Sequence, residues 1–442
     1  MKSRPYRARH GAGYLRILAI LPLLASLGGC GEVENADAAI GPVVTLAKKG
    51  GSNPTIALDS TSGTAFVAWI ARTDGTANVY MASSGAGDSA WSQPVRVNDI
   101  PGDAAPHEQA PAQIAVGPEG TLYILWQNRT DVEWLPYGGS DLRLSRSTDG
   151  GRTWSPAVSV NDDADGLPAR HTFHDLAVAP DGTVYVSWID ARIRDHQRKE
   201  GWAATQTEAA SGQHEHGGEE PGTEIRVARS TDGGLTFGPS AILDSNSCPC
   251  CRTSISIGSD GEAYVAWRKI FPGGIRDIVV ARAAPRTVDF AAPVSVHQDG
   301  WVFPGCPHAG PSVAVDADGA VHVAWYTGAD DRLGLWYAVS RDNAQTFDAP
   351  IPLLTDDWVP PSQVKLDAAG DRVWIAWDDR RTESPRWFLA LDNGAGGLNM
   401  IERAGRPGTL PAVAATQSRA AVAWLSGEAV RTTRVVADTP ER

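Results

Sequence analysis

Three of the five cysteines in this 442-residue chain lie within four positions, in the segment 248-CPCC-251. A fourth, Cys306, lies in 303-FPGCPHAGP-311. Thiols and imidazoles are ligands for copper(I) and zinc, although a CxCC run does not match the paired CxxC spacing of many zinc sites. The candidate metal ligands are Cys248, Cys250, Cys251, Cys306, His308 and His174.

The same thiols have two other interpretations. Four cysteines remain after Cys30, which is an even number, and disulfides are the favoured interpretation, with Cys306 pairing with Cys250 or Cys251. The other is a reactive thiol, because Arg252 and nearby histidines would lower its pKa. The cysteines therefore predict two segments that are cross-linked, metal-binding or reactive.

Charged side chains gather in short runs such as 190-DARIRD-195 and 378-DDRR-381. Glycoside hydrolysis usually needs two carboxylates that flank the scissile bond, and Asp190 with Asp378 or Asp356 is the candidate pair. These runs are also typical of a solvated rim held by surface ion pairs, which is the competing interpretation. The candidate catalytic residues are Asp190, Asp356, Asp378, Arg192 and Arg252.

The first thirty residues have the pattern of an export signal. A basic segment precedes the apolar run 15–24, which is too short to span a bilayer, and 27-LGGC-30 follows it. This arrangement resembles the signal peptide of bacterial lipoproteins, which implies cleavage after residue 29 and a lipid on Cys30. Residues 30–41 are then a tether, and Gly31 implies sorting to the outer membrane. The alternative is an ordinary signal peptide.

Compartment and charge narrow the range of partners. Export predicts an oxidising environment in which disulfides are permitted. The net charge is −13, and it becomes more negative once the basic leader is removed. A nucleic-acid partner is not expected, because proteins that bind nucleic acids neutralise phosphates with Lys and Arg. Membrane contact at the bacterial cell envelope is expected through the lipid anchor only.

One phrase recurs along the chain and ends each time in tryptophan. In 54-PTIALDSTSGTAFVAW-69 and 311-PSVAVDADGAVHVAW-325, two short apolar runs flank a turn rich in Gly and Asp. Such a phrase predicts a β-hairpin, and further short runs after most copies complete four strands. The closing tryptophans are Trp69, Trp126, Trp188, Trp267, Trp325, Trp377 and Trp424.

The repeats predict an all-β fold, namely a single β-propeller of four-stranded antiparallel blades over residues 42–436, followed by a tail at 437–442. Seven blades are expected, and six are the alternative. The last repeat lacks a fourth strand before the C-terminus. The run 42-PVVTLA-47 is expected to supply this strand, which closes the ring and covers the sheet edges.

The turn between the third and fourth strands carries the motif S-x-D-x-G-x-T-(W/F). It is complete in 147–154 and 230–237, and 340–347 departs from it only at Ala344, which replaces the glycine. The carboxylate can accept turn N–H groups, glycine supplies a positive φ, and the aromatic ring fills space beside the sheet. The structural residues of these boxes are Asp149, Trp154, Asp232, Phe237, Asp342 and Phe347.

These boxes resemble the Asp-box (BNR) repeats of sialidase-like propellers, and the resemblance covers nearly the whole mature chain. It implies the propeller fold more strongly than any activity. The arginine triad and the tyrosine nucleophile of sialidases are not recognisable. The first innermost strand, 52-SNPTIALD-59, has no arginine, and the starts of three later ones have no tyrosine, namely 310-GPSVAV-315, 361-PSQVKL-366 and 411-PAVAAT-416.

Strand order predicts which face of the propeller carries the unusual residues. Strands within a blade alternate in direction. The connection from the fourth strand of one blade to the first strand of the next therefore lies on the same face as the connection between the second and third strands of a blade. All four cysteines after Cys30, and eight of the nine histidines after His10, fall in these connections, including 214-HEH-216, a further metal candidate. This pattern predicts a module that binds a glycan, a peptide or an envelope protein through a Cys/His-rich loop face. The alternatives are a glycoside hydrolase such as an exo-sialidase, and a periplasmic protein that handles copper or zinc.

Overall fold

The computed structural model describes residues 38–163, 166–205, 223–392, 394, 397–417 and 419–437. The chain divides into two units, Met1–Glu34 and Asn35–Arg442, and the described residues belong to the second. The expected signal peptide, the lipid on Cys30 and the 214-HEH-216 segment lie outside the described residues. Within the described ranges, no helix is both long and apolar enough to cross a membrane.

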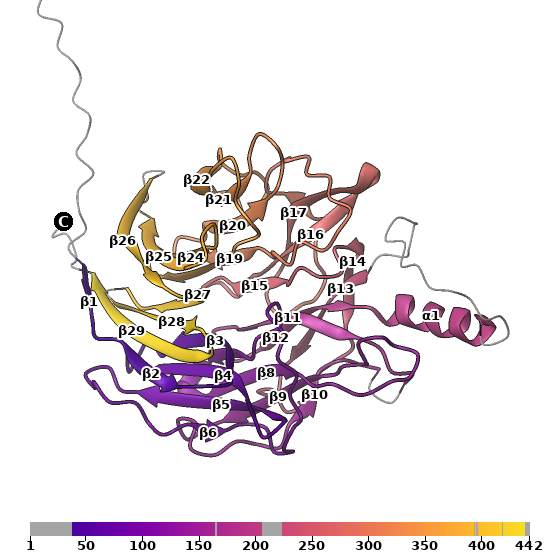
Figure 1. Ribbon diagram of the computed structural model, residues 1–442, viewed down its shortest axis with the longest axis horizontal. Helices are drawn as coiled ribbons and strands as arrows, with labels where there is room; N and C mark the ends of the chain where they lie inside the picture. The colour runs from indigo at the N-terminus through magenta and orange to yellow at the C-terminus, as the bar shows by residue number, and fades with distance from the viewer. Residues whose placement is uncertain are drawn as a thin grey trace, which may run out of the picture. The chain divides into compact units, whose positions relative to one another are not determined.

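The regular structure is almost entirely antiparallel β-sheet (Figure 1). In most sheets four consecutive strands pair in chain order, because each strand turns back on the one before it through a short connection. The first sheet contains β3 (Gly51–Leu58), β4 (Ala65–Thr73), β5 (Thr76–Ser84) and β6 (Val95–Arg96), and the second contains β7 (Gln113–Val116), β8 (Leu122–Gln127), β9 (Leu142–Ser147) and β10 (Val158–Ser159).

A larger sheet follows, in which a single residue pair, Ser247 with Lys269, joins two four-stranded units. Its strands are β11 (His171–Val178), β12 (Val184–Asp190), β13 (Thr223–Ser230), β14 (Ala241–Ser247), β15 (Ser254–Ile257), β16 (Ala263–Phe271), β17 (Ile275–Ala283) and β18 (Val294–Ser295). Two further four-stranded sheets contain β19 (Ser312–Val315), β20 (Val321–Thr327), β21 (Gly334–Ser340) and β22 (Ile351–Thr355), and β23 (Val364–Ala369), β24 (Arg372–Asp379), β25 (Arg386–Asp392) and β26 (Leu398–Pro407).

The last sheet combines strands from both ends of the described chain (Figure 1). Both N-terminal strands pair antiparallel with the last strand, β29 (Ala429–Ala437), so that Ala39 lies opposite Val436 and Val44 lies opposite Thr432. The expected N-terminal strand is therefore confirmed, and pairing already begins at Ala38, inside the predicted tether. The strands of this sheet are β1 (Ala38–Ile40), β2 (Val44–Ala47), β27 (Thr409–Ala415), β28 (Arg419–Ser426) and β29 (Ala429–Ala437).

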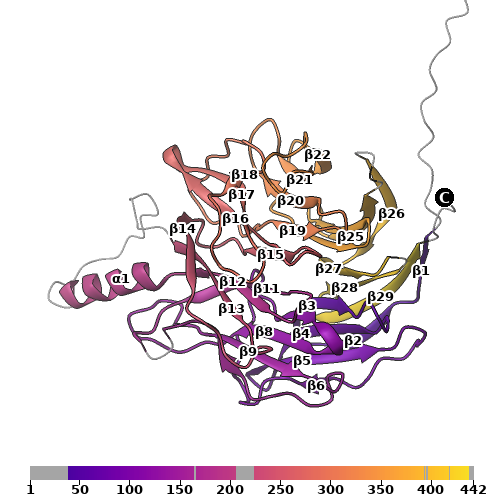
Figure 2. The same ribbon diagram turned by 180° about the vertical axis from the view of Figure 1, so that it is seen from behind.

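The innermost strands follow one another around the middle of the sheet assembly, as Figures 1 and 2 show from opposite sides, and a central cavity lies between them. Contacts run in order from β3 through β7, β11, β15, β19 and β23 to β27, and from β27 back to β3. Residues of all these strands line the cavity, which has a volume of about 310 Å³. Sheets arranged around a common channel are the defining feature of a β-propeller, the fold that the repeats predict.

The hydrophobic core lies between neighbouring sheets. Each closing tryptophan of the repeats is at most 3% exposed and packs against apolar side chains of the preceding sheet as well as its own. Several indole N–H groups also bond to carboxylates, for example Trp267 to Asp244 at 2.8 Å and Trp325 to Asp299 at 2.7 Å. The repeated phrase therefore encodes both a hairpin and the contact between adjacent sheets.

The Asp boxes are local turns in the β9–β10, β13–β14 and β21–β22 connections. In the first, Asp149 accepts the backbone N–H of Thr153 at 3.0 Å and its hydroxyl at 2.6 Å. These hydrogen bonds stabilise the carboxylate and lower the pKa of Asp149. In the third box, Asn343 and Ala344 both have a φ of 61°, so alanine adopts the left-handed conformation that glycine has elsewhere. In the first box, the hydrogen bonds of the Asp149 carboxylate stay within its own turn.

The long connection after β12 contains a helix, α1 (Arg192–Thr205), which is not among the elements predicted from the sequence. Its start is fixed by Asp190, whose Oδ1 accepts the backbone N–H of Arg192 at 3.0 Å in the manner of a helix cap. Arg170 pairs with the buried Asp195 in the first turn and ties the helix to the β10–β11 connection. The helix is therefore anchored at its N-terminal end.

Candidate functional site

A cavity of about 360 Å³ lies among the connections on one face of the sheets. Its lining comes from the β6–β7, β18–β19 and β22–β23 connections, which join a fourth strand to a first strand, and from the β24–β25 connection, which joins a second strand to a third. These are the two kinds of connection that are predicted to share a face. We name this cavity the loop-face pocket, and it is lined by His107, Glu108, Pro307, His308, Pro361 and Arg380.

Two imidazoles line the loop-face pocket, with the ring centroids of His107 and His308 5.9 Å apart. His107 Nδ1 accepts the backbone N–H of Gln109 at 3.1 Å, which places the proton of the neutral ring on Nε2. Desolvation by the surrounding protein, followed by the neighbouring His308, lowers the pKa of His107, so the neutral ring predominates at neutral pH. His107 therefore offers an N–H donor, and the exposed His308 offers a second imidazole.

A guanidinium joins two carboxylates at the side of the pocket. Arg380 donates through Nη1 to Glu108 at 2.7 Å and through Nε to Asp378 at 3.0 Å. Asp378 is fully buried and also accepts the N–H groups of Gln363 at 2.7 Å and Leu410 at 2.8 Å. Glu108 is the accessible member, since 42% of its side chain is exposed. The pocket thus combines a fixed carboxylate acceptor, imidazoles and the apolar surface of two prolines.

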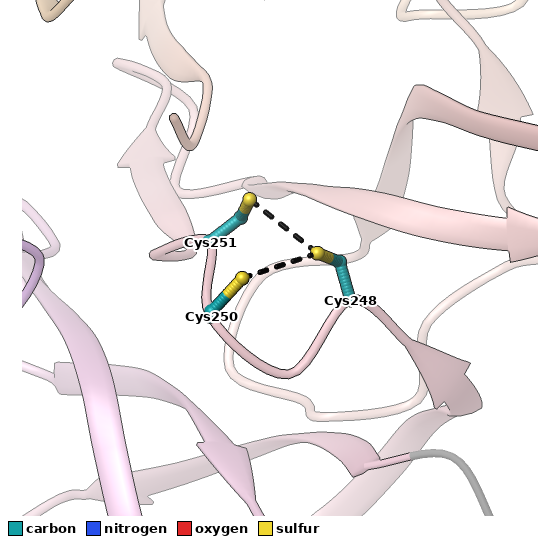
Figure 3. Close-up of side chains that lie close together, drawn as sticks. All are labelled: Cys248, Cys250 and Cys251. Atoms are coloured by element: carbon teal, nitrogen blue, oxygen red, sulfur yellow. Dashed lines mark hydrogen bonds between the residues drawn. The ribbon is translucent and has the colours of Figure 1, made fainter. Parts of the chain in front are cut away.

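The three cysteines of 248-CPCC-251 converge in the β14–β15 connection, and Figure 3 shows their sulfur atoms turned toward one another. Sγ of Cys248 lies 3.7 Å from Sγ of Cys250 and 3.5 Å from Sγ of Cys251. All three are buried, and every cysteine in the described part of the chain is a free thiol. The predicted disulfide from Cys306 to Cys250 or Cys251 is not formed in the structure.

Cys250 also belongs to a second group, with Cys306 and His308. The two Sγ atoms and a ring nitrogen of His308 lie within 4.8 Å of one another. The β14–β15 and β18–β19 connections therefore meet, as the sequence predicts. Cys306 and His308 are exposed whereas Cys250 is 4% exposed, so the combined cluster extends from the surface to the interior.

The sixth predicted metal ligand, His174, does not belong to either group. It lies within β11 rather than in the preceding connection, and it is buried. Its Nε2 is 3.0 Å from the carbonyl oxygen of Pro111, and burial lowers the pKa of His174 to about 4. The ring therefore links β11 to the β6–β7 connection, and its assignment as a metal ligand is corrected.

Asp190 and Arg192 have an architectural role instead of the predicted catalytic one. Asp190 is 1% exposed and accepts from His171 at 3.0 Å, Trp188 at 3.0 Å and Arg192 at 2.7 Å. Burial alone would raise the pKa of Asp190, but His171 and Arg192 hold it far below its usual range. A general acid needs a raised pKa and access to the substrate, and Asp190 has neither.

The partners proposed for Asp190 are held in separate ion pairs. Asp378 is buried against Arg380, as described above. Asp356 is exposed and pairs with Arg381, which in turn binds Asp379. Each of the three carboxylates therefore has its own cationic partner.

Arg252 is also structural. It is 3% exposed, and its guanidinium donates to Oε1 of Gln363 and to the carbonyl oxygen of Val364, both at 2.8 Å. These bonds connect the β14–β15 connection, which carries the cysteines, to the start of β23. Arg252 therefore fixes the position of the thiol-bearing connection.

The central cavity holds ionisable residues that the sequence analysis missed. Asp175 of β11 and Lys365 and Asp367 of β23 all line it. The alternation in 364-VKLDAA-369 could have revealed them, because residues two apart share one face of a strand. Burial lowers the pKa of Lys365 to about 8 and raises the pKa of Asp367 to about 7.

We expect Asp367→Asn to stabilise the protein at mildly alkaline pH. The folded chain keeps the proton of Asp367 up to about pH 7, whereas the unfolded chain releases it near pH 4. The stability of the wild type therefore falls as pH rises through this window, and the variant lacks this loss. The free energy of unfolding of the variant should exceed that of the wild type by about 2 kcal/mol at about pH 8 and should equal it at about pH 4. Urea denaturation at the two pH values measures this difference. The exposed Asp331→Asn is the control, and an equal gain there would contradict the assignment.

Neither a family model nor a curated protein matches this sequence. Solved structures do match. An ulvan lyase of polysaccharide lyase family PL25, bound to -[GlcA(1-4)Rha3S]-, aligns with a TM-score of 0.55 at 12% identity over 88% of this chain and 95% of that chain. A protein of unknown function from Dyadobacter fermentans DSM 18053 aligns with a TM-score of 0.50 at 12% identity over 91% of this chain and 99% of that chain. The Hadza microbial sialidase Hz136 aligns with a TM-score of 0.48 at 12% identity over 91% of this chain and 97% of that chain.

At these identities the likeness establishes the fold alone. The alignments extend over nearly the full length of each partner, so the whole described sheet assembly is shared rather than a fragment of it. The fold that the repeats predict, a β-propeller of four-stranded antiparallel sheets, is the fold that this chain has.

Proposed function

We propose that this protein binds a glycan in the loop-face pocket and acts as a binding module rather than as a glycoside hydrolase. The observation that carries the proposal is the convergence of Glu108, His107 and His308 in one cavity on the loop face. Sugar hydroxyls both donate and accept hydrogen bonds, so they need both kinds of partner. The pocket supplies both, together with apolar surface for the carbon-bound face of a sugar ring.

The polar groups of the pocket are held in place before any ligand binds. Arg380 fixes Glu108 by a 2.7 Å bond and is itself fixed by the buried Asp378. The backbone N–H of Gln109 fixes the ring of His107. Because these groups are already oriented, a ligand would lose less free energy in ordering them.

The shared fold supports a glycan as the ligand class. The ulvan lyase structure, which has the highest similarity of the three described above, contains a bound glucuronate–rhamnose sulfate saccharide. This chain has the same arrangement of sheets, and its pocket lies among the connections on one face. Hydrolysis is disfavoured because Asp190, Asp378 and Asp356 are each neutralised by a neighbouring cation.

Two finer features belong to the same proposal. The cyclic order of innermost strands from β3 to β27 supports seven blades. The basic leader and 27-LGGC-30 support attachment through a lipid on Cys30 to the outer membrane of a bacterial envelope. A lipid-anchored propeller of this kind would present its loop face to glycans at the cell envelope.

The proposal is tested by calorimetric titration of the mature protein with -[GlcA(1-4)Rha3S]- oligosaccharides and with a sialylated trisaccharide. We expect one of these glycans to bind, and we expect Glu108→Gln and His308→Ala each to weaken binding by about tenfold or more, which corresponds to the loss of one hydrogen bond. Asp331→Asn, outside the pocket, is the control and should bind as the wild type does. Absence of binding, or equal binding by the pocket variants, would contradict the proposal. Release of cleaved saccharide would instead identify an enzyme.

A further inference from the structure

We name the group of Cys248, Cys250, Cys251, Cys306 and His308 the thiol cluster, and we infer that it is a copper(I) site. Cys248, Cys250 and Cys251 hold the ion, and Cys306 with His308 forms its route from solvent. This inference goes beyond glycan binding and does not depend on it. It rests on the juxtaposition of two connections that are far apart in sequence and meet at Cys250.

The buried triad has the dimensions of a three-coordinate metal site. Two of its Sγ–Sγ separations are 3.5 and 3.7 Å, and all three sulfurs lie within 4.8 Å of one another. A metal–sulfur bond of about 2.3 Å places the sulfurs of a trigonal site roughly 4 Å apart. Only a small expansion of the triad is therefore needed to admit an ion. The backbone N–H of Cys248 donates to the backbone carbonyl oxygen of Arg268 at 2.9 Å, and this bond holds one end of the cysteine-bearing connection in place.

The number and type of ligands favour copper(I) over zinc. Among the described residues, the buried group contains three sulfur ligands and no carboxylate or imidazole. Structural zinc sites are almost always four-coordinate and tetrahedral. Soft thiolates suit copper(I) as well as zinc, and three buried sulfurs satisfy copper(I) without a further ligand.

The charges around the triad also favour a monovalent ion. Arg276 donates through Nη1 to Sγ of Cys248 at 3.1 Å, and the buried Arg268 acts on the same thiol electrostatically. Three thiolates with one copper(I) carry a charge of about −2, which these two guanidiniums balance. A divalent ion would leave the buried site with excess positive charge, and burying unbalanced charge is costly.

Cys306 and His308 provide the path into the triad. They are exposed, and both lie within 4.8 Å of the sulfur of Cys250, which is also a member of the buried group. The ion can pass by exchanging one sulfur or nitrogen ligand for the next, without any change of oxidation state. The thiols must lose their protons to bind it, and these protons are released to solvent.

The test uses the reduced, full mature protein and copper(I) alone, added without oxygen and competed with a copper(I) chelator. We expect one ion to be retained per chain, with the ultraviolet absorption of a copper(I) thiolate. Cys251→Ser should weaken retention by about 100-fold. Cys306→Ser should slow loading from the chelator by about tenfold. His297→Ala removes a histidine of the same face that pairs with Asp299 outside the cluster, and it should leave retention unchanged.

Circular dichroism of each metal-free variant separates loss of the site from loss of the fold, and the wild-type titration carries the inference even where a variant does not fold. Retention of zinc in preference to copper(I) would overturn the inference, as would unchanged retention in Cys251→Ser. A disulfide between Cys306 and Cys250 or Cys251 in the protein from its native envelope would also overturn the inference. Alkylation followed by mass spectrometry detects such a bond.

Discussion

Asp190→Asn is expected to lower the free energy of unfolding by about 3 kcal/mol, because it removes one member of a buried charge network. The carboxylate of Asp190 contacts His171, Trp188 and Arg192, and all of them are packed at the end of β12. The amide of asparagine carries no charge, so it cannot neutralise Arg192. The largely buried guanidinium of Arg192 then has one negative partner fewer. Urea denaturation measures the loss, provided that the dependence of the free energy of unfolding on urea concentration has the same slope in both proteins.

The effect of Asp190→Asn should also depend on pH. Burial would lower the pKa of His171, but the carboxylates of Asp163 and Asp190 raise it to about 9. The stability gained from charged His171 is therefore full below about pH 6.5 and is lost as the pH rises to about 9. The difference between wild type and variant should be larger at about pH 6 than at about pH 9.

The exposed Asp356→Asn is the matched control, because it removes the same charge from a surface ion pair with Arg381. Surface pairs contribute about 0–1 kcal/mol, so a small change is expected. If both variants were equally stable and only Asp190→Asn abolished turnover of a glycan, the catalytic assignment of Asp190 would be restored.

The fold could be predicted because its signals are local. Each tryptophan phrase forms a hairpin with its own turn, and the preceding sheet along the chain supplies the surface against which the tryptophan packs. The N-terminal strand over 44–47 could be predicted from the strand that the last repeat lacks. Strand β1 was missed because 38-AAI-40 is short and contains two alanines, which are depleted in strands.

Helix α1 could not be predicted for a different reason. Its sequence, 192-RIRDHQRKEGWAAT-205, is polar on nearly all sides and has no apolar stripe at helical spacing. Its start depends on one local contact, the Asp190 cap, and on one tertiary contact, the pair between Arg170 and Asp195. The tertiary contact is not visible in the local pattern.

The candidate site could be predicted in its residue types and its face, but not in its pairings. Strand order alone places the cysteine-bearing connections on one face, and the structure brings Cys250 and Cys306 together there. The partner of each charged group depends on the three-dimensional arrangement. Arg380 binds Glu108 across 272 positions of sequence, so no local signal shows that Glu108 is fixed and exposed in a pocket.

Gly310→Ala is expected to destabilise the protein by about 3 kcal/mol, because the chain passes too close to Arg252 to admit a side chain. A methyl group on Gly310 would overlap the carbonyl oxygen of Arg252 and would lie 2.6 Å from its Cγ and 2.8 Å from its nitrogen. Arg252 cannot yield easily, since its guanidinium is bonded to Gln363 and Val364 and the N–H of Thr253 donates to Phe173 at 3.0 Å.

The cost of Gly310→Ala reports on the contact that builds the thiol cluster, because Gly310 follows His308 closely and Arg252 directly follows Cys251. Separation of the two connections should also make Cys250 react faster with a thiol reagent. Gly87→Ala is the control, because no atom lies within 4 Å of the carbon that this substitution adds. The free energy of unfolding of the Gly87→Ala protein should therefore change little. Equal stability of Gly310→Ala and Gly87→Ala would mean that the β14–β15 and β18–β19 connections are not packed together, and the shared thiol cluster would then have no structural basis.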